Sequence, residues 1–127
     1  MVTDPIADLL IRLQNASRVG KPAVSLPFSK MKLAIAEILS KEGYVGEGVA
    51  KKNYTLTIPL KYTAGRPAIE GAKRVSKPSR RTYFGVRDVR PVKKGHGLMV
   101  LSTPKGVMTG LEAKRARVGG EVLFEIW

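Results

Sequence analysis

The sequence predicts an α+β protein built from two small mixed domains, and three observations support this fold class. Two segments with helical spacing of apolar residues lie among short β-type runs in the first sixty residues. The second half is mainly β-type, with one short helix, and residues 61–67 between the halves have the composition of a turn or linker. We therefore expect an N-terminal domain over residues 1–62, with two helices on a short sheet. A C-terminal domain over residues 63–127 should be mostly β with one short helix.

The first helix is predicted to begin at Asp4, which is a good N-cap, with Pro5 in the first helical position. Apolar residues then recur on one helix face, at Ile6, Leu9, Leu10 and Leu13. Gly20 and Pro22 end the helix, and residues 23–27 follow as a short strand. We expect the apolar stripe to be core.

The second helix is predicted to be capped by Ser29 and to stop at Gly43. Its expected core side consists of Met31, Ile35, Ile38 and Leu39. A strand should begin at residues 44–45, and another alternates over residues 54–60, where Pro59 indicates a sheet edge or a strand end. One face of this second strand is expected to hold Tyr54, Leu56, Ile58 and Leu60.

The C-terminal half begins with a charged segment over residues 73–81, whose turn is marked by Pro78-Ser79. Residues 85–97 are polar and irregular, and should be tethered by Val86, Val89 and Val92. Residues 98–101 are wholly apolar, which predicts a strand with both faces buried.

A capping box opens the last helix, because Thr109 can cap it and Glu112, three residues later, can reach back. The helix is expected over residues 110–117 and should end at Gly119-Gly120. Cations near its C-terminus suit the helix dipole, and they are Lys114, Arg115 and Arg117. Residues 121–127 form the final strand, which should pack its terminal Trp127.

The formal charge of +13 indicates an acidic partner, because like charges otherwise oppose compactness. The excess of positive charge is uneven. Residues 1–50 hold six basic and five acidic side chains, whereas residues 51–127 hold seventeen basic and five acidic side chains. Cations spread over strands and loops favour a nucleic acid. A membrane surface would need one concentrated basic amphipathic helix, which the sequence lacks.

Composition also limits the compartment. The chain has no cysteine, so neither a disulfide framework nor a thiolate metal site can form. No apolar run reaches the roughly eighteen residues of a membrane span, and residues 1–5 do not resemble the start of a secretory signal. A cytosolic protein is therefore expected.

The polar stretch over residues 102–109 is the strongest candidate site, because the buried strand before it provides a rigid base. The turn is expected to present Ser102, Thr103 and Lys105. Hydroxyl groups both donate and accept hydrogen bonds, so they can match base edges and ribose 2′-hydroxyls. Gly106 would let the backbone approach a ligand closely. A solvated strand and turn explains the same residues taken alone.

The charged segment over residues 73–81 has five cations in nine residues, followed at once by Tyr83 and Phe84. Cations beside aromatic rings suit a sugar-phosphate chain with exposed bases. This makes Lys77, Arg80, Arg81 and Tyr83 candidates for nucleic-acid contact. A solvated hairpin with a charged tip is the alternative interpretation.

Catalytic patterns are missing from the sequence. The lone His96 lies between two glycines, and no Walker loop, dinucleotide loop or nucleophile elbow is present. We expect no catalytic residue, metal, cofactor or small-molecule substrate. The least implausible enzyme is a metal-dependent nuclease using Asp88 with Glu112 or Glu121, and a generic basic nucleic-acid-binding module or RNA chaperone is the non-enzymatic alternative.

These motifs, in this order, resemble the bacterial type of the small-ribosomal-subunit protein S-eight family. Residues 3–8 with Asn15-Ala16 are similar to its first helix, and residues 73–78 with Arg80-Arg81 and Tyr83 are similar to its middle signature. Its C-terminal signature is resembled by Ser102-Thr103, residues 105–109, Ala113, residues 119–121 and Trp127. The chain departs from the family at Pro104, usually a serine, and at Ser79, usually a glycine.

The resemblance implies two small packed domains that bind a helical region of the 16S rRNA central domain early in assembly of the subunit platform, mainly through the C-terminal domain. The implied RNA contacts are Ser102, Thr103, Lys105, Gly106 and Thr109, with Gly120 and Glu121 nearby. Thr3, Asn15 and Lys30 complete the predicted site. Proteins S-five and S-twelve are the implied neighbours, on a cytoplasmic ribosome or an organellar one.

Overall fold

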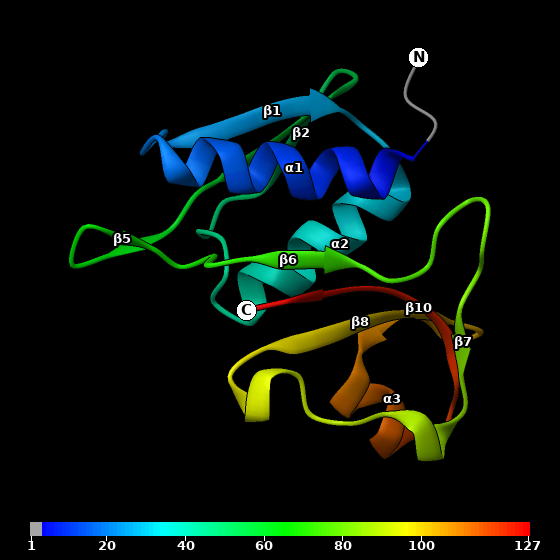
Figure 1. The fold of residues 1–127 in the computed structure, drawn as a ribbon. Helices are drawn as coiled ribbons and strands as arrows, with labels where there is room; N and C mark the ends of the chain where they lie inside the picture. Colours follow the sequence, from blue (N-terminus) through cyan, green and yellow to red (C-terminus); the bar gives the residue numbers. More distant parts are fainter. Residues whose placement is uncertain (1–3) are drawn as a thin grey trace. The chain divides into compact units, whose positions relative to one another are not determined.

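The structure is a computed structural model that describes residues 4–127, apart from the side chain of Lys94 (Figure 1). The chain divides into two compact units. We call residues 7–70 the N-terminal unit, and residues 71–127 together with residues 4–6 the C-terminal unit. Both units combine helices with antiparallel strands, so the predicted α+β class is confirmed.

The N-terminal unit contains two helices and a three-stranded antiparallel sheet of order β1-β3-β2. Its main elements are α1 (Pro5–Arg18), β1 (Ala23–Pro27), α2 (Lys30–Lys41), β2 (Ala50–Lys52) and β3 (Thr55–Pro59). The segment expected to be a turn or linker forms a small hairpin of β4 (Tyr62–Thr63) and β5 (Arg66–Pro67). The predicted bounds of β1 and the Ser29 cap of α2 are both confirmed.

The core of this unit confirms the stripe predicted for α1 but corrects the one predicted for α2. Leu9, Leu10 and Leu13 are buried, and so are Ile35 and Leu39; Ile6, the stripe residue that belongs to the C-terminal unit, is buried as well. Met31, however, is exposed, and Lys32 is buried instead. The buried face of α2 follows the spacing 32, 35, 36 and 39. Lys32 satisfies its ammonium group by donating to the Pro27 carbonyl at 3.1 Å, so its apolar stem can pack inward.

The alternating strand is confirmed as β3, with Leu56, Ile58 and Leu60 buried, but two details of the strand predictions were wrong. Tyr54 is 88% exposed, because β3 begins only at Thr55 and Asn53, with a φ of +57°, turns the chain before it. Residues 44–45 do not form a strand; Val45 makes only an isolated bridge with Leu60. Strand β2 was not predicted, since all its residues are exposed and give no apolar alternation.

The C-terminal unit is mostly β, as predicted, with β10 (Gly120–Ile126) at its centre. One edge of β10 pairs with β6 (Ala72–Arg74) and β7 (Tyr83–Phe84), and the other pairs with β8 (Leu98–Thr103). Strand β9 (Gly106–Thr109) pairs with β8. Two short 3₁₀ turns, η1 (Val86–Asp88) and η2 (Lys93–Gly95), lie in the predicted irregular segment. The buried cluster contains Val92, Met99, Leu101 and Val122, with Val89 and Trp127 packed against it.

Helix α3 (Gly110–Ala116) has the predicted capping box: Thr109 Oγ1 accepts from the Glu112 amide at 3.2 Å, and Glu112 Oε1 accepts from the Thr109 amide at 3.3 Å.

The predicted stop of α3 at Gly119-Gly120 was wrong. Arg117 ends the helix in a left-handed conformation, with a φ of +56°. The two glycines instead allow β10 to lie close to its neighbours. A Cβ atom at Gly119 would lie 2.4 Å from the Phe84 carbonyl oxygen, and one at Gly120 would lie 2.2 Å from that of Ser102.

Candidate nucleic-acid interface

The sheet register of the C-terminal unit aligns three predicted site residues in one row. Glu121 of β10 lies opposite Tyr83 of β7 on one side and opposite Ser102 of β8 on the other. Residues paired in antiparallel strands point to the same face and lie about 5 Å apart. Three segments that are distant in sequence therefore present a phenol, a carboxylate and a hydroxyl side by side. We call Tyr83, Glu121 and Ser102 the cross-strand row.

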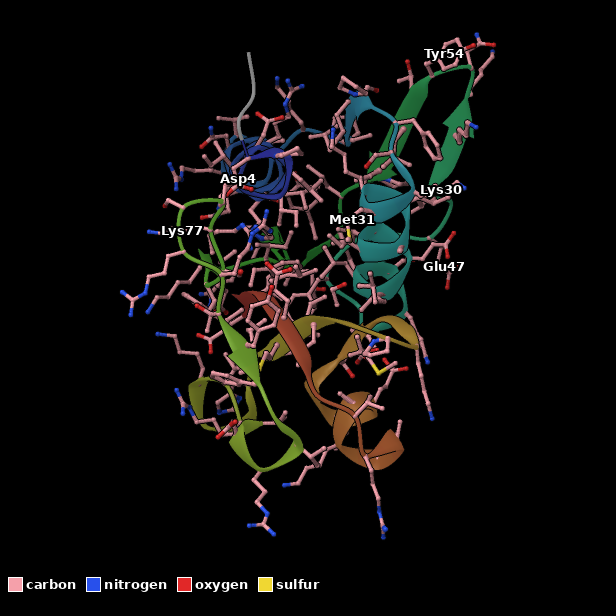
Figure 2. The ribbon with its side chains drawn as sticks, turned by 90° about the vertical axis from the view of Figure 1, so that its right-hand side faces the viewer. Asp4, Lys30, Met31, Glu47, Tyr54 and Lys77 are labelled. Carbon is pink, nitrogen blue, oxygen red and sulfur yellow. The ribbon has the colours of Figure 1, made fainter. Side chains whose placement is uncertain are left out.

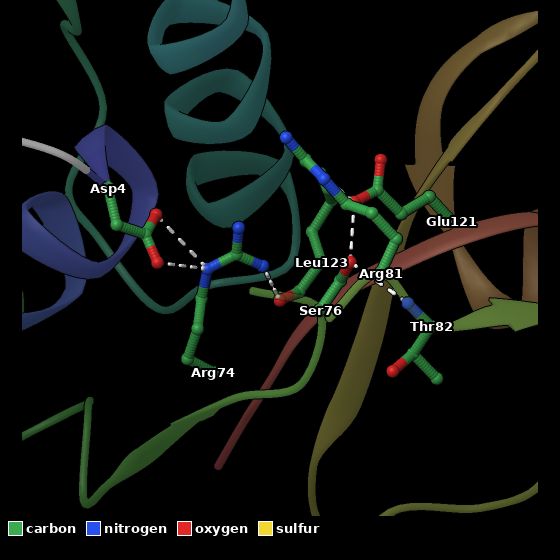
Figure 3. Close-up of polar contacts among 7 residues, drawn as sticks. All are labelled: Asp4, Arg74, Ser76, Arg81, Thr82, Glu121 and Leu123. Atoms are coloured by element: carbon green, nitrogen blue, oxygen red, sulfur yellow. Dashed lines mark hydrogen bonds and ion pairs between the residues drawn. The ribbon is translucent and has the colours of Figure 1, made fainter. Parts of the chain in front are cut away.

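A buried serine fixes this row to the neighbouring basic turn (Figure 3). Ser76 has no exposed surface, and its hydroxyl donates to Glu121 Oε2 at 2.5 Å. The same oxygen of Ser76 accepts from the Thr82 amide at 3.1 Å. Arg81 also donates to Glu121 Oε2, at 3.0 Å. Ser76 and Thr82 flank the turn, so one hydroxyl ties both of its ends to β10.

The basic turn itself spans residues 77–80 and is closed by two backbone hydrogen bonds. The Lys77 amide donates to the Arg80 carbonyl at 2.9 Å, and the Arg80 amide donates back at 2.9 Å. The predicted turn at Pro78-Ser79 is confirmed, and Lys77 and Arg80 are exposed. Two cations thus have a fixed backbone and side chains that extend into solvent beside the cross-strand row.

The carboxyl group of Glu121 stays ionised in this setting. Burial by itself raises the pKa of Glu121, but hydrogen bonds from Ser76 and Arg81 and the charges of Arg81 and Arg74 outweigh burial and lower it below its usual value of 4.5. An ionised carboxylate can only accept hydrogen bonds. Because Arg81 neutralises it, Glu121 can face a polyanion without strong repulsion.

Arg74 anchors the start of the same segment. Its Nε donates to both carboxylate oxygens of Asp4, at 3.3 and 3.1 Å, and its Nη1 donates to the Leu123 carbonyl (Figure 3). Sequence reasoning missed both Ser76 and Arg74 as site-forming residues. They lie within a charged run, and nothing in that run distinguishes a buried side chain from a solvated one.

The tight turn between β8 and β9 corrects the expectation that Thr103 is presented to a ligand. Thr103 is only 8% exposed, and its hydroxyl donates to the Gly106 carbonyl at 2.8 Å and accepts from the Lys105 amide at 3.1 Å. Pro104, Lys105 and Gly106 are the exposed residues of this turn. Thr103 therefore shapes the turn, and Lys105 is the cation that it presents.

The remaining predicted residues have other positions. Thr109 is buried and its hydroxyl caps α3, while Gly120 packs against the Ser102 backbone. Asn15 on α1 and Lys30 at the start of α2 are exposed residues of the N-terminal unit. Thr3 lies outside the described residues.

The carboxylates of the nuclease alternative have structural partners. Asp88 accepts from the Gly85 amide at 2.8 Å, Glu112 belongs to the capping box, and Glu121 is bound by Ser76 and Arg81. Within residues 4–127, no group of three or more His, Asp or Glu side chains is arranged to hold a metal ion. No helix in the same residues has the length and apolar character needed to cross a membrane.

Comparison with known proteins identifies the family. The family model for ribosomal protein S8 matches residues 4–127. The chain belongs to this family. It is therefore a ribosomal protein of the small subunit and a non-enzymatic structural protein, so the resemblance seen in the sequence is confirmed and the nuclease alternative is not supported.

Three curated relatives, each called small ribosomal subunit protein uS8, show how far the similarity extends. The chain is 50% identical over 127 residues to the protein of Nitratidesulfovibrio vulgaris strain Hildenborough, which covers 100% of both chains. It is 52% identical over 130 residues to that of Roseiflexus castenholzii, covering 99% of this chain and 98% of the relative. It is 49% identical over 125 residues to that of Burkholderia cenocepacia, covering 96% and 95%.

Proposed function

We propose that this ribosomal protein binds a helical region of the 16S rRNA central domain through its C-terminal unit and helps to assemble the platform of the small subunit. The observation that supports this most directly is the cross-strand row. Tyr83, Glu121 and Ser102 come from three separate segments, yet the register sets them on one face. Exposed cations of the adjoining turns, Lys77, Arg80 and Lys105, provide the charge that an RNA backbone requires.

The proposed contacts have two roles: some position the protein on the RNA backbone, and others distinguish one RNA element from another. Lys77, Arg80 and Lys105 neutralise phosphates and hold the protein on the RNA. The Ser102 hydroxyl can donate to and accept from base edges or ribose 2′-hydroxyls, and the ring of Tyr83, which is 68% exposed, can stack on an unpaired base. The buried hydroxyls of Thr103 and Thr109 act indirectly, because they fix the turn and the helix beside Ser102.

Binding selectivity tests the proposal. The full chain is titrated with a 16S rRNA central-domain transcript and, separately, with duplex DNA of similar length at the same salt concentration. The transcript should bind more tightly, and bound protein should protect one helical element from hydroxyl radicals. Equal affinity for both polyanions, with no localised protection, would favour a generic basic nucleic-acid-binding module or RNA chaperone instead.

The proposal extends to the surroundings of the protein. We infer a cytoplasmic ribosome as its location, and proteins S-five and S-twelve of the small subunit as its protein neighbours. Crosslinking within assembled subunits tests these neighbours, since adducts to neither protein would remove them from the proposal.

A further inference from the structure

The segment that carries the basic turn leaves the edge of β10 and returns to it at one residue. The Ser76 amide donates to the Val122 carbonyl at 3.0 Å, and the Val122 amide donates to the Thr82 carbonyl at 2.9 Å. Residues 77–81 therefore project from the sheet between β6 and β7, and we call them the projecting loop. Figure 2 shows the side chain of Lys77 extending outward from this loop. Ser76 and Thr82 lie side by side at its base, which we call the neck.

The neck lacks one regular backbone hydrogen bond, and the side chain of Ser76 supplies it. In a regular antiparallel pair the Thr82 amide would donate to the Val122 carbonyl, but that carbonyl accepts from the Ser76 amide. The Thr82 amide donates to the Ser76 hydroxyl at 3.1 Å instead. Ser76 has no exposed surface, so bulk water does not reach this hydroxyl. Closure of the neck therefore depends on one buried oxygen atom.

The same hydroxyl attaches the neck to the cross-strand row (Figure 3). Ser76 Oγ donates to Glu121 Oε2 at 2.5 Å, and Arg81, the last residue of the projecting loop, donates to the same carboxylate oxygen at 3.0 Å. One oxygen thus holds the residue before the loop and the residue at its end. Glu121 also lies between Tyr83 and Ser102 in the sheet register. A displacement of the neck would therefore displace the row as well.

The projecting loop has no buried side chain of its own to fix its position. All five of its residues are exposed, and three of them are cations, Lys77, Arg80 and Arg81. The position of the loop therefore rests on the backbone hydrogen bonds of the basic turn and on the neck. A loop that is ordered only when the ligand arrives loses affinity, because binding must then supply the cost of ordering it. A closed neck removes this cost before binding.

We propose that Ser76 is a positioning residue for RNA binding, because its buried hydroxyl closes the neck and holds the cations Lys77 and Arg80 beside the cross-strand row. Ser76 acts through these neighbours and does not itself touch the RNA. This role rests on the proposed RNA-binding function, and it adds that the projecting loop and the row act as one surface. The loop cations then contribute fully to affinity only while the hydroxyl is present. Lys105, on the separate turn between β8 and β9, contributes equally with or without it.

Double-mutant cycles on the full chain test this role. Each variant is titrated with the 16S rRNA central-domain transcript under conditions in which circular dichroism shows that it is folded. Ser76→Ala should weaken binding at least about 5-fold, the cost of ordering two long side chains on binding. Arg80→Ala should weaken wild-type binding, and its effect should be at least about 2-fold smaller in the Ser76→Ala background, as for residues that depend on each other. Lys105→Ala should weaken binding by the same factor in both backgrounds.

Amide hydrogen exchange distinguishes an open neck from a generally weakened fold. In the free protein, Ser76→Ala should speed exchange of the Thr82 amide by more than it speeds exchange in the ladder between β8 and β10. Ser17→Ala, which removes the hydroxyl of a 5% exposed serine on α1, is the matched control and should change neither this exchange nor transcript affinity. If Ser76→Ala does not fold, Ser76→Cys replaces it in the cycles, because a thiol fills similar space but is a weak hydrogen-bond partner.

The possible results separate this role from RNA binding itself. A folded Ser76 variant with wild-type affinity, or an unchanged exchange rate at Thr82, would overturn the positioning role while RNA binding stands. The same conclusion would follow if Arg80→Ala had no effect in wild type or an equal effect in both backgrounds, or if Ser17→Ala lost as much affinity as Ser76→Ala. A wild-type chain that fails to bind the transcript would overturn the proposed function, and the role of Ser76 with it.

Discussion

Replacing Gly120 by alanine should damage both the fold and the site of the C-terminal unit. The added Cβ would lie 2.2 Å from the Ser102 carbonyl oxygen, 2.9 Å from its carbon and 3.1 Å from the Thr103 Cα. All three are backbone atoms, so no side chain can rotate away. Relief requires that β10 move away from β8 by about 1 Å, and overpacking of this kind typically costs 1–3 kcal/mol. With a weakened backbone hydrogen bond of about 1 kcal/mol added, we expect a loss of about 3 kcal/mol in unfolding free energy.

Urea unfolding measures this loss directly, and titration with the central-domain transcript measures its consequence for binding. Because Glu121 and Ser102 face each other at the site of the clash, affinity should fall at least about 10-fold under conditions in which the variant stays folded. Gly85→Ala is the control, since its Cβ would meet nothing nearer than Asp88 Oδ2 at 3.5 Å and its φ of −82° suits alanine. That variant should remain within about 1 kcal/mol of wild type. A Gly120→Ala variant as stable as Gly85→Ala, with wild-type affinity, would refute the close-approach argument.

Four further predictions follow from the same contacts. Ser76→Ala removes the partner of the Thr82 amide and should cost about 1–3 kcal/mol in urea unfolding; no loss would show that the hydroxyl is dispensable. Because the pKa of Glu121 is lowered in the folded protein, the ionised carboxylate contributes fully to the unfolding free energy above pH 4.5. This contribution is lost as pH falls through the pKa of Glu121 in the folded protein. The stability advantage of wild type over Glu121→Gln should therefore shrink below pH 4.5. A stability advantage that stays constant from pH 7 to 3 would contradict the lowered pKa of Glu121. Ser102→Ala should weaken transcript binding by roughly 1–3 kcal/mol while the control Ser25→Ala does not; equal effects would remove Ser102 from the site. If about six phosphates are neutralised, affinity should fall ~10³-fold between ~50 and ~200 mM salt, and a flat response would argue against electrostatic binding.

Features set by neighbouring residues could be predicted from the sequence. The capping box of Thr109 and Glu112 depends on two side chains three positions apart, and Ser29 and Pro5 mark helix starts in the same local way. The apolar run at residues 98–101 identified the strand that supports Ser102. These signals depend on spacing along the chain, and this explains why the fold class, the three helices and the strands β1, β3, β8 and β10 were predicted correctly.

Features set by distant residues could not be predicted. Met31 and Lys32 differ by one position on a helix face, and only the packed sheet decides that the lysine stem is buried. Gly119 and Gly120 look like a helix stop, yet their role depends on the carbonyls of Phe84 and Ser102 on neighbouring strands. The cross-strand row likewise exists only through the register of β7, β8 and β10, which no local pattern encodes.

Directed hydroxyl-radical probing would test most sharply whether this face of the C-terminal unit meets ribosomal RNA. The chain has no cysteine, so Pro104→Cys gives a single attachment point for an iron chelate on the exposed turn beside Ser102. In a complex with 16S rRNA, cleavage should concentrate in one helical element of the central domain, whereas the cysteine-free wild-type chain treated with the same reagent should leave that element uncut. A stable complex in which the chelate at position 104 cuts no RNA above background would contradict the proposed interface.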